Sequence, residues 1–339
     1  MLLSNDLGES MNSEDANRSD LSRAVFTIAV GKPIFLDMAI ALARSFLRWN
    51  ALSNIGFAIV TDKPREQCPQ DLKSIQWIQV PVGKYGTGFT PKLYLDEMAP
   101  AKRSLFIDAD CLCVRSLDEV FDKFSGHAVS VVGTNRRSGE WFGDVAAICK
   151  VLGLRHYPYF NGGVYYLEPG PVATAVFQQA RAYCERYDEI GFVRLRDREN
   201  DEVLIATAMA GHGLDPVDED GTIMNTLMDA EGGMNLDVLS GEAVLYNPQD
   251  HPKKARGHSL EVLRPAIMHL NDMDIARHPY RTQVMMLNLA TRGWPENLAR
   301  IFASVFSAAP AIVMRYVARV ARPLIHGTLG PRSVKPTLR

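Results

Sequence analysis

The chain has 339 residues, of which 47% are hydrophobic and 22% are charged, and its formal net charge at pH 7 is −2. This composition excludes a disordered, collagen-like or disulfide-stapled chain, and the length supports one large domain with appendages or two ordinary domains. The small net charge gives no indication of nucleic-acid binding through a basic surface.

Charge is unevenly distributed along the chain. Residues 1–22 contain five acidic residues and one basic residue, which predicts a disordered acidic tail. Residues 297–339 contain seven basic residues and no acidic residue, so a basic appendage follows a mildly acidic body. The first residues lack a basic segment followed by an apolar run, and the five cysteines are spread out and odd in number. These features favour a reduced, cytoplasmic protein without a secretory signal.

Short apolar strands alternate with helices through the first half of the chain. Strands are predicted at 24–30, 56–62, 77–82, 103–110 and 127–133, and helices at 35–49 and 92–100. This alternation predicts a mostly parallel, doubly wound α/β sheet, which places ligands at the carboxyl ends of its strands. Neither G-x-G-x-x-G after the first strand nor G-x-x-x-x-G-K-[ST] occurs, so the two best-known phosphate loops are absent.

The pattern is less regular beyond residue 150. Strands are predicted at 159–170, 243–247 and 266–270, helices at 171–187 and 201–210, and a loop-rich stretch at 211–264. Residues 295–323 are predicted to be mostly helical with a break at Pro310. The longest late uncharged stretch, 301–314, has 14 residues and is too short to span a membrane.

Two carboxylates stand at the predicted end of a buried strand, in the sequence Asp108-Ala109-Asp110. Strand side chains alternate between faces, so Asp108 and Asp110 are predicted to point the same way. Two carboxylates on one face repel each other unless a positive charge lies between them, and a divalent cation carrying phosphates meets that need. A polar strand end that caps the next turn is the alternative interpretation.

Three further features accompany this pair. Lys92 lies sixteen residues before Asp108, Asn161-Gly162-Gly163 opens a predicted strand, and His269 ends a late strand. An imidazole added to two carboxylates suits Mn²⁺ better than Ca²⁺. A histidine in such a place also fits a satisfied core residue, so both interpretations stay open.

Together these segments resemble glycosyltransferases of the GT-A fold, in particular the retaining family 8, which includes glycogenin and lipopolysaccharide galactosyl- and glucosyltransferases. The match at 91–121 is the most specific, because it combines the Lys-to-Asp spacing, the D-x-D and the following S-L-D-E-V-F. The weaker matches are at 160–169, 200–208, 244–247 and 267–272, in the family's order. The resemblance implies a GT-A catalytic domain with a doubly wound mixed sheet over 23–280, and C-terminal helices with a basic tail over 281–339.

The resemblance also implies individual roles at the metal and phosphates. Asp108 and Asp110 would bind Mn²⁺ or Mg²⁺ and the ribose-diphosphate, and His269 would be the third protein ligand. Lys92 would contact the donor near its phosphates or sugar, although a solvated helix start is an alternative.

The remaining implied contacts surround the nucleotide and the sugar. The backbone of Ala29, Val30 and Gly31 would meet the nucleobase, and Phe35 would stack on it or else be a core helix residue. Asn161 and Gly162 would line the donor sugar, or else form a strand-opening turn. Asp201 would hold sugar hydroxyls, or else serve as a helix N-cap. Ala109 would contact the donor from within the D-x-D.

The chain departs from the family pattern at two places. The family commonly has Asp-Gln where this chain has Asp201-Glu202, and that Gln lies near the sugar face opposite the leaving group. Glu202 could stabilise or attack an oxocarbenium-like centre, bind the acceptor, or be a solvated helix residue. With Asp201 and Asn161 it forms the predicted catalytic set. The family's Gly and Lys after the His are missing, so Arg277, with Arg281 as the second choice, is assigned to the diphosphate.

Two features lie outside this donor site. Cys111 and Cys113 are predicted to be structural, packed on the face opposite the Asp pair if the strand continues past Asp110. Arg315, Arg319 and Arg322 share one helix face beside apolar stripes. Such a helix can contact an anionic membrane, which predicts a cytoplasmic protein peripheral to the inner face, or it can pack on the domain with its arginines in water.

The sequence therefore predicts a metal-dependent transfer of a hexose from a nucleotide-sugar, a UDP-sugar by preference, to a glycan or lipid-linked acceptor with retention. Two alternatives stay open. A D-x-D after a strand also suits a haloacid-dehalogenase-type phosphatase, although that family has the motif on its first strand. A non-catalytic protein of the nucleotide-sugar fold that docks on membranes is the other.

Overall fold

The structure, a computed structural model, describes residues 21–248, 260–270 and 276–329. The chain divides into two compact units, Met1–Asn271 and Asp272–Arg339, which are described separately. Residues 1–20 of the predicted acidic tail lie outside the described residues.

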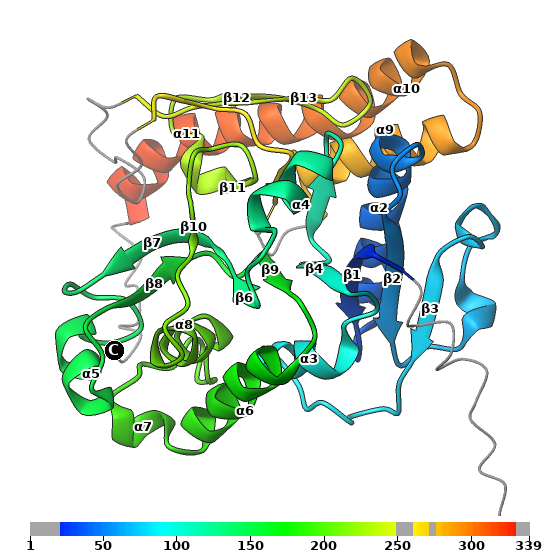
Figure 1. Ribbon diagram of the computed structural model, residues 1–339. Coiled ribbons are helices and arrows are strands. Elements are labelled where there is room, and N and C mark those ends of the chain that lie inside the picture. The colour runs from blue at the N-terminus through cyan, green and yellow to red at the C-terminus, as the bar shows by residue number, and fades with distance from the viewer. Residues whose placement is uncertain (1–20, 249–259, 271–275, 330–339) are drawn as a thin grey trace, which may run out of the picture. The chain divides into compact units, whose positions relative to one another are not determined.

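A six-stranded mixed sheet forms the centre of the first unit (Figure 1). Its strands in spatial order are β3 (Gln76–Gln79), β2 (Gly56–Thr61), β1 (Arg23–Ala29), β4 (Arg103–Ile107), β9 (Val164–Leu167) and β6 (Val129–Ser130). Strands β1 to β4 run parallel, and β9 is antiparallel to both β4 and β6. The central strands are continuous apolar runs because both faces of the sheet are covered.

Helices pack on both faces of this sheet. On one face, Phe57 of β2 contacts Phe46 of α2 (Pro33–Asn50), with ring centroids 5.0 Å apart. On the other face, Phe26 and Phe106 lie in the core that also contains side chains of α3 (Leu95–Met98), α6 (Pro171–Glu185) and α8 (Asp201–Gly211). Figure 1 shows α2 on one side of the sheet and α3 and α6 on the other. The predicted mixed α/β architecture is confirmed.

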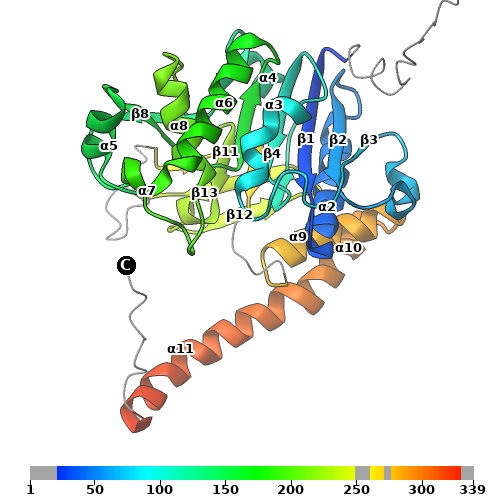
Figure 2. The same cartoon turned by 90° about the horizontal axis from the view of Figure 1, so that it is seen from below.

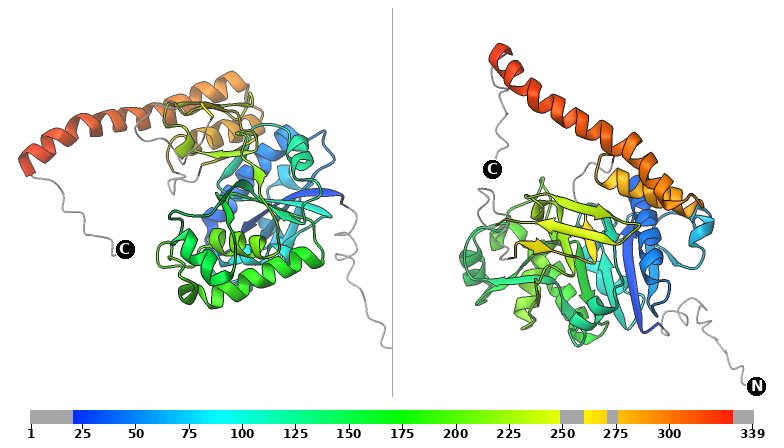
Figure 3. Two further views of the ribbon diagram at one scale, coloured as in Figure 1. Left: turned by 60° about the vertical axis from the view of Figure 1, so that its left-hand side comes forward. Right: turned by 90° about the horizontal axis from the view of Figure 1, so that it is seen from above.

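Three small sheets complete the first unit. Their strands are β10 (Val217–Asp218), β7 (Val132–Arg136) and β8 (Tyr157–Phe160); β11 (Met224–Thr226), β15 (Ile267–His269) and β5 (Cys111–Cys113); and β12 (Met234–Asp237), β13 (Glu242–Tyr246) and β14 (Val262–Leu263). The third is the group of yellow strands in the right view of Figure 3. The remaining helices are α4 (Asp118–Phe124), α5 (Val145–Leu152), α7 (Tyr187–Ile190) and 3₁₀ turns at Arg65–Gln67, Gln70–Leu72, Thr90–Tyr94 and Leu227–Asp229.

One predicted strand is shorter in the structure and two are divided. The strand predicted at 103–110 ends at Ile107, and the turn at 108–110 leads to β5, which belongs to another sheet. The segment 127–133 divides into β6 and β7, and 159–170 divides into β8 and β9 at Asn161-Gly162-Gly163. An apolar run does not indicate to which sheet each of its parts belongs. A prediction from hydrophobicity alone therefore treats two short strands as one.

The second unit consists of α9 (Tyr280–Thr291), α10 (Glu296–Ala303), a π-helical turn (Ser304–Ala308) and α11 (Ala309–Leu329). The predicted break at Pro310 is wrong, since α10, the π turn and α11 follow one another without interruption, as the long helix in Figure 2 shows. The π turn lies directly before Pro310, where the missing N–H would interrupt regular α-helical bonding. Within the part of the chain that the structure describes, one segment, Glu296–Arg319, is long and apolar enough to cross a membrane, with a mean hydropathy of 1.6. The uncharged stretch 301–314, judged too short to span a membrane, is therefore only part of a longer apolar helix.

Candidate active site

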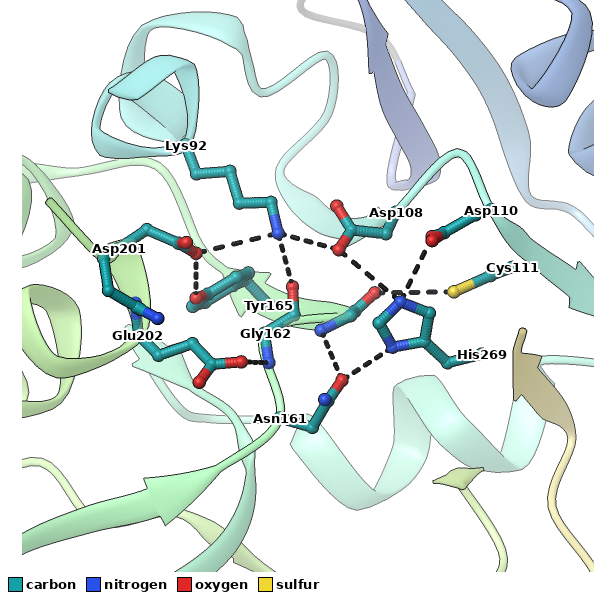
Figure 4. Close-up of polar contacts among 12 residues, drawn as sticks. Lys92, Asp108, Asp110, Cys111, Asn161, Gly162, Tyr165, Asp201, Glu202 and His269 are labelled. Atoms are coloured by element: carbon teal, nitrogen blue, oxygen red, sulfur yellow. Dashed lines mark hydrogen bonds and ion pairs between the residues drawn. The ribbon is translucent and has the colours of Figure 1, made fainter. Parts of the chain in front are cut away.

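The acidic pair lies in the turn between β4 and β5, at the carboxyl end of β4 (Figure 4). The backbone N–H of Cys111 donates to the carbonyl of Asp108 (3.0 Å), which closes the turn, and the N–H of Asp108 donates to the carbonyl of Gly163 (2.9 Å). The explanation by strand alternation is therefore wrong. The turn, tied to the start of β9, brings Asp108 and Asp110 to one side.

His269 faces both carboxylates from β15, which pairs antiparallel with β5. Its Nε2 lies 3.1 Å from Oδ1 of Asp110 and 3.9 Å from Oδ2 of Asp108. The three predicted metal ligands thus come from two segments far apart in the sequence, and the imidazole lies within 4 Å of both carboxylates. The His269 side chain is only 7% exposed, and the two carboxylates are 20% and 27% exposed.

Asn161 sets the tautomer of His269. The Asn161 side-chain atom that accepts from the Gly163 N–H (3.1 Å) must be its oxygen, and the same oxygen lies 2.6 Å from Nδ1 of His269. Nδ1 must therefore carry a proton, and in neutral His269 the lone pair of Nε2 points at the carboxylates. Two lone pairs at 3.1 Å need a positive charge between them.

Either a proton or a divalent cation can provide that charge. Burial lowers the pKa of His269, but the carboxylates of Asp110 and Asp108 together outweigh burial and raise the pKa above its ordinary value. Burial likewise raises the pKa of Asp110, and the His269 imidazolium brings it below its usual range. The donor set of two carboxylates and one imidazole fits Mn²⁺ or Mg²⁺ at the same place.

Lys92 links the acidic pair to the rest of the site. Its Nζ donates to Oδ2 of Asp108 (2.7 Å) and to the carbonyl of Gly162 (2.9 Å), and lies 3.7 Å from Oδ2 of Asp201. The side chain is 15% exposed, so the alternative of a solvated helix start is wrong. Burial lowers the pKa of Lys92, but Asp108 and Asp201 raise it above its ordinary value, and the ammonium stays charged.

Asp201 and Glu202 enter the site from the first turn of α8. Asn200 caps this helix, since its side chain accepts from the N–H of Glu202 (2.6 Å), so the N-cap alternative for Asp201 is wrong. Asp201 instead accepts the hydroxyl of Tyr165 (2.5 Å). Glu202 accepts the N–H of Gly162 through Oε1 (2.7 Å). Glu202 thus holds the Asn-Gly-Gly segment, and Asp201 holds Tyr165 of β9, which follows that segment.

The two glycines leave space for side chains of the site itself. A Cβ on Gly163 would lie 2.5 Å from Nδ1 of His269, and one on Gly162 would lie 2.8 Å from the Tyr165 hydroxyl and 2.9 Å from Cγ of Glu202. The sequence interpretation assigned the small residues to close approach of the sugar. The structure adds a second reason, because any larger residue would displace the groups around it.

Replacing Gly163 by Ala should damage the site without unfolding the chain. The new Cβ would push the His269 ring off Asn161 and away from the acidic pair, so we expect a roughly 10–100-fold loss of divalent-metal affinity. Isothermal titration with Mn²⁺ in the presence of UDP measures it. Gly211→Ala is the matched control, because a Cβ there meets no atom closer than 3.8 Å and Gly211, like Gly163, does not have a positive φ. Unchanged affinity in Gly163→Ala would contradict this account.

The predicted nucleobase contacts lie where β1 ends. The N–H of Gly31 donates to Asp62 (2.9 Å) and its carbonyl accepts from Nζ of Lys63 (2.9 Å), so the ends of β1 and β2 are tied together. Gly31 has a φ of +84°, which glycine adopts without strain. The side chain of Phe35 is 37% exposed, so the alternative of a core residue is wrong. Val30 and Ala29 lie beside Gly31 at the same edge.

Sequence reasoning missed several residues that the structure brings into this region. These are Asp62, Lys63, Tyr165 and Asn200. A signal existed for two of them, since Asn200 precedes a predicted helix as an N-cap does, and Lys63 follows a strand end. Arg277 and Arg281 belong to the second unit, and their assignment to the diphosphate stays a prediction.

Comparison with known proteins identifies the architecture. The galactosyltransferase LgtC, crystallised with donor and acceptor sugar analogs, matches with a TM-score of 0.50 over 83% of this chain and 95% of its own, at 13% identity. An active-site Gln-to-Glu mutant of LgtC matches with a TM-score of 0.52 over 82% of this chain and 99% of its own, at 15% identity. The chain has a GT-A fold. No protein-family model matches the sequence, and no curated protein does.

The GT-A fold sets aside the phosphatase alternative. In the structure the D-x-D follows β4, the fourth strand along the chain, whereas the haloacid-dehalogenase interpretation needs it after the first. The converging donor atoms lie at the carboxyl ends of parallel strands, where α/β sheets hold their ligands.

Proposed function

We propose that the chain is a metal-dependent glycosyltransferase that moves a hexose from a UDP-sugar to a glycan or lipid-linked saccharide with retention. The observation that carries the proposal is that His269 lies within 4 Å of both Asp108 and Asp110, beside Lys92, at the carboxyl end of β4. The GT-A fold supports the class of reaction, and LgtC, which shares the fold, is a galactosyltransferase.

The charged side chains at the end of β4 have two different proposed roles. Asp108, Asp110 and His269 would hold Mn²⁺ or Mg²⁺, and a divalent cation there would neutralise charge on the departing diphosphate. Lys92 places a fixed positive charge between Asp108 and Asp201, at the boundary between the metal ligands and the sugar pocket.

The sugar would lie against the Asn-Gly-Gly segment and the start of α8. Asp201 is 3% exposed and is held by Tyr165, so its carboxylate is oriented before a donor arrives. Oδ1 of Asn161 is committed to Gly163 and His269, so a sugar contact falls to its amide nitrogen, and Asn161 is a positioning residue. The carbonyl of Gly162 accepts from Nζ of Lys92, and its N–H donates to Glu202.

Thermal melting tests the donor site. We expect UDP and Mn²⁺ together to raise the melting temperature of the wild type, whereas either ligand alone shifts it far less, because binding to the folded state alone stabilises it. Asp110→Ala should lose the shift, and Asp122→Ala, which removes an exposed carboxylate of α4, should keep it. Failure of the wild type to respond would overturn the proposal and favour the non-catalytic alternative. A response is then followed by a screen of UDP-sugars.

We further propose that the second unit attaches the enzyme to an anionic membrane on its cytoplasmic side. Its helices carry large apolar side chains that are at least half exposed, namely Leu298, Ile301, Val305, Phe306, Ile312, Val313, Met314, Tyr316 and Val317. Basic residues without any acidic residue accompany them over 297–339. Apolar surface beside basic charge favours contact with anionic lipid, which would bring the enzyme to a surface that holds lipid-linked acceptors.

Flotation with vesicles tests this attachment. The full chain should float with vesicles rich in phosphatidylglycerol and less with vesicles of phosphatidylcholine alone, because the basic residues add attraction to anionic lipid. Replacing Ile312 and Val313 by Ser should reduce flotation on both, since both side chains are more than half exposed. Equal flotation on the two vesicle types would remove the electrostatic part of the proposal.

A further inference from the structure

Cys111 lies on the same side as the acidic pair, which is the reverse of the expectation from strand alternation. The expectation assumed that the strand continues past Asp110, but the turn at 108–110 intervenes before β5 begins at Cys111. In the β5–β15 ladder Cys111 is directly opposite His269. Directly opposite residues of antiparallel strands point to the same face, so the sheet itself holds thiol and imidazole side by side.

The three donor atoms lie close to one another. One oxygen of Asp110, Sγ of Cys111 and one ring nitrogen of His269 all lie within 4.8 Å of one another. Cys111 and His269 are buried, and Sγ of Cys111 contacts the carbonyl of Gly163 at 4.0 Å (Figure 4). A carboxylate, a thiol and an imidazole form a different donor set from the two carboxylates and imidazole that suit Mn²⁺.

We propose that Asp110, Cys111 and His269 form a second, mutually exclusive binding mode for a thiolate-preferring divalent cation such as Zn²⁺. Zn²⁺ accepts sulfur, nitrogen and carboxylate ligands in tetrahedral sites, whereas Mn²⁺ prefers oxygen and imidazole. On binding, the thiol proton passes to buffer and the thiolate takes its place as ligand. Because Asp110 and His269 serve both modes, Zn²⁺ displaces Mn²⁺ and blocks the donor site.

The two modes differ in what they require. The Mn²⁺ mode includes Asp108, whose charge is otherwise matched by Lys92, and it is completed by the diphosphate of the donor. The Zn²⁺ mode leaves the Asp108–Lys92 pair intact and needs no nucleotide. Zn²⁺ binding therefore stands independently of the proposed transfer, while the blocking effect rests on the proposed function.

Cobalt and zinc test the mode directly on the full chain. With Co²⁺ alone, the wild type should show the near-ultraviolet charge-transfer band of a thiolate bound to cobalt, and Cys111→Ser should lack it. Cys113→Ser is the matched control, because Cys113 is an equally buried thiol two residues along the same strand. Calorimetry with Zn²⁺ should show a loss of affinity of roughly 10–100-fold or more in Cys111→Ser, since even outer-shell partners contribute that much, and an unchanged affinity in Cys113→Ser.

The outcomes separate the two proposals. A band that persists in Cys111→Ser, or a wild type that lacks it, overturns the assignment of Cys111, and the wild-type spectrum decides even if the variant fails to fold. Zn²⁺ should also abolish the melting shift caused by Mn²⁺ and UDP in the wild type but not in Cys111→Ser. If the shift is missing altogether while the cobalt band is present, the transferase proposal fails and the cysteine site stands.

Discussion

Lys92→Met should lower the free energy of unfolding by about 3–5 kcal/mol, the usual effect of removing one partner of a buried ion pair. The variant leaves the mostly buried carboxylate of Asp108 and the fully buried one of Asp201 without their shared ammonium, and the carbonyl of Gly162 loses a donor. Met fills a similar volume, so packing changes little. Urea unfolding followed by circular dichroism measures the difference.

The control is Lys73→Met, which removes an exposed lysine and should change stability by less than about 0.5 kcal/mol. The folded pKa of Lys92 is raised, so its stabilising effect is fully present below its unfolded pKa of about 10.4 and is lost only as the pH rises through the folded value. The loss in Lys92→Met should therefore be the same at pH 6 and pH 8. A loss below about 1 kcal/mol would mean that the carboxylates do not depend on Lys92.

Asp201→Asn should lower the rate of sugar transfer by roughly 10²–10³-fold, the usual effect of removing one preorganised charged contact at a reacting centre. Its carboxylate is buried, fixed by Tyr165 and paired with Lys92, so the substitution removes a charge that water cannot replace. Steady-state rates with the UDP-sugar identified in the screen measure the effect, and it should appear in kcat more than in KM.

Glu202→Gln is the matched comparison, because it neutralises the neighbouring carboxylate of the same helix turn. A Gln oxygen can still accept the Gly162 N–H, so we expect the rate to stay within about tenfold of the wild type. The reverse pattern, with Glu202→Gln far slower than Asp201→Asn, would assign the reacting carboxylate to Glu202. Equal small effects would exclude both residues from the chemistry.

Much of the fold could be predicted from hydrophobic periodicity. The first strand, the following helix and the second strand were predicted at 24–30, 35–49 and 56–62 and are found at Arg23–Ala29, Pro33–Asn50 and Gly56–Thr61. These are long, strongly patterned segments whose neighbours along the chain are also neighbours in space. Local pattern and tertiary structure agree there.

The errors in the fold share one cause. At 127–133 and 159–170 the chain passes from one sheet to another within one predicted strand, and the strand predicted at 103–110 ends at Ile107 before the turn that leads to β5. Membership of a sheet depends on partners distant in sequence, as when β5 pairs with β15, and a local window contains no information on them. The misplaced face of Cys111 followed directly from such an error.

The site was predictable as a set of residues but not as a network. Asp108, Asp110, His269 and Lys92 were singled out by residue type, spacing and resemblance, and the structure brings them together. The orientations of the side chains were not predictable, because that of His269 depends on a hydrogen bond with Asn161 and that of Asp201 on one with Tyr165. Hydrogen bonds of this kind follow from tertiary packing, which a sequence motif does not encode.

Because β5 pairs with β15, the site can form only late in the synthesis of the chain. The acids of the D-x-D emerge early in synthesis, but His269 emerges only after every other strand of the first unit has been translated. Domains fold as their chain becomes available, from the N-terminal end onward. A nascent chain that stops before residue 267 therefore has the carboxylates without their imidazole, so a site that needs all three side chains can form only after β15 has been made.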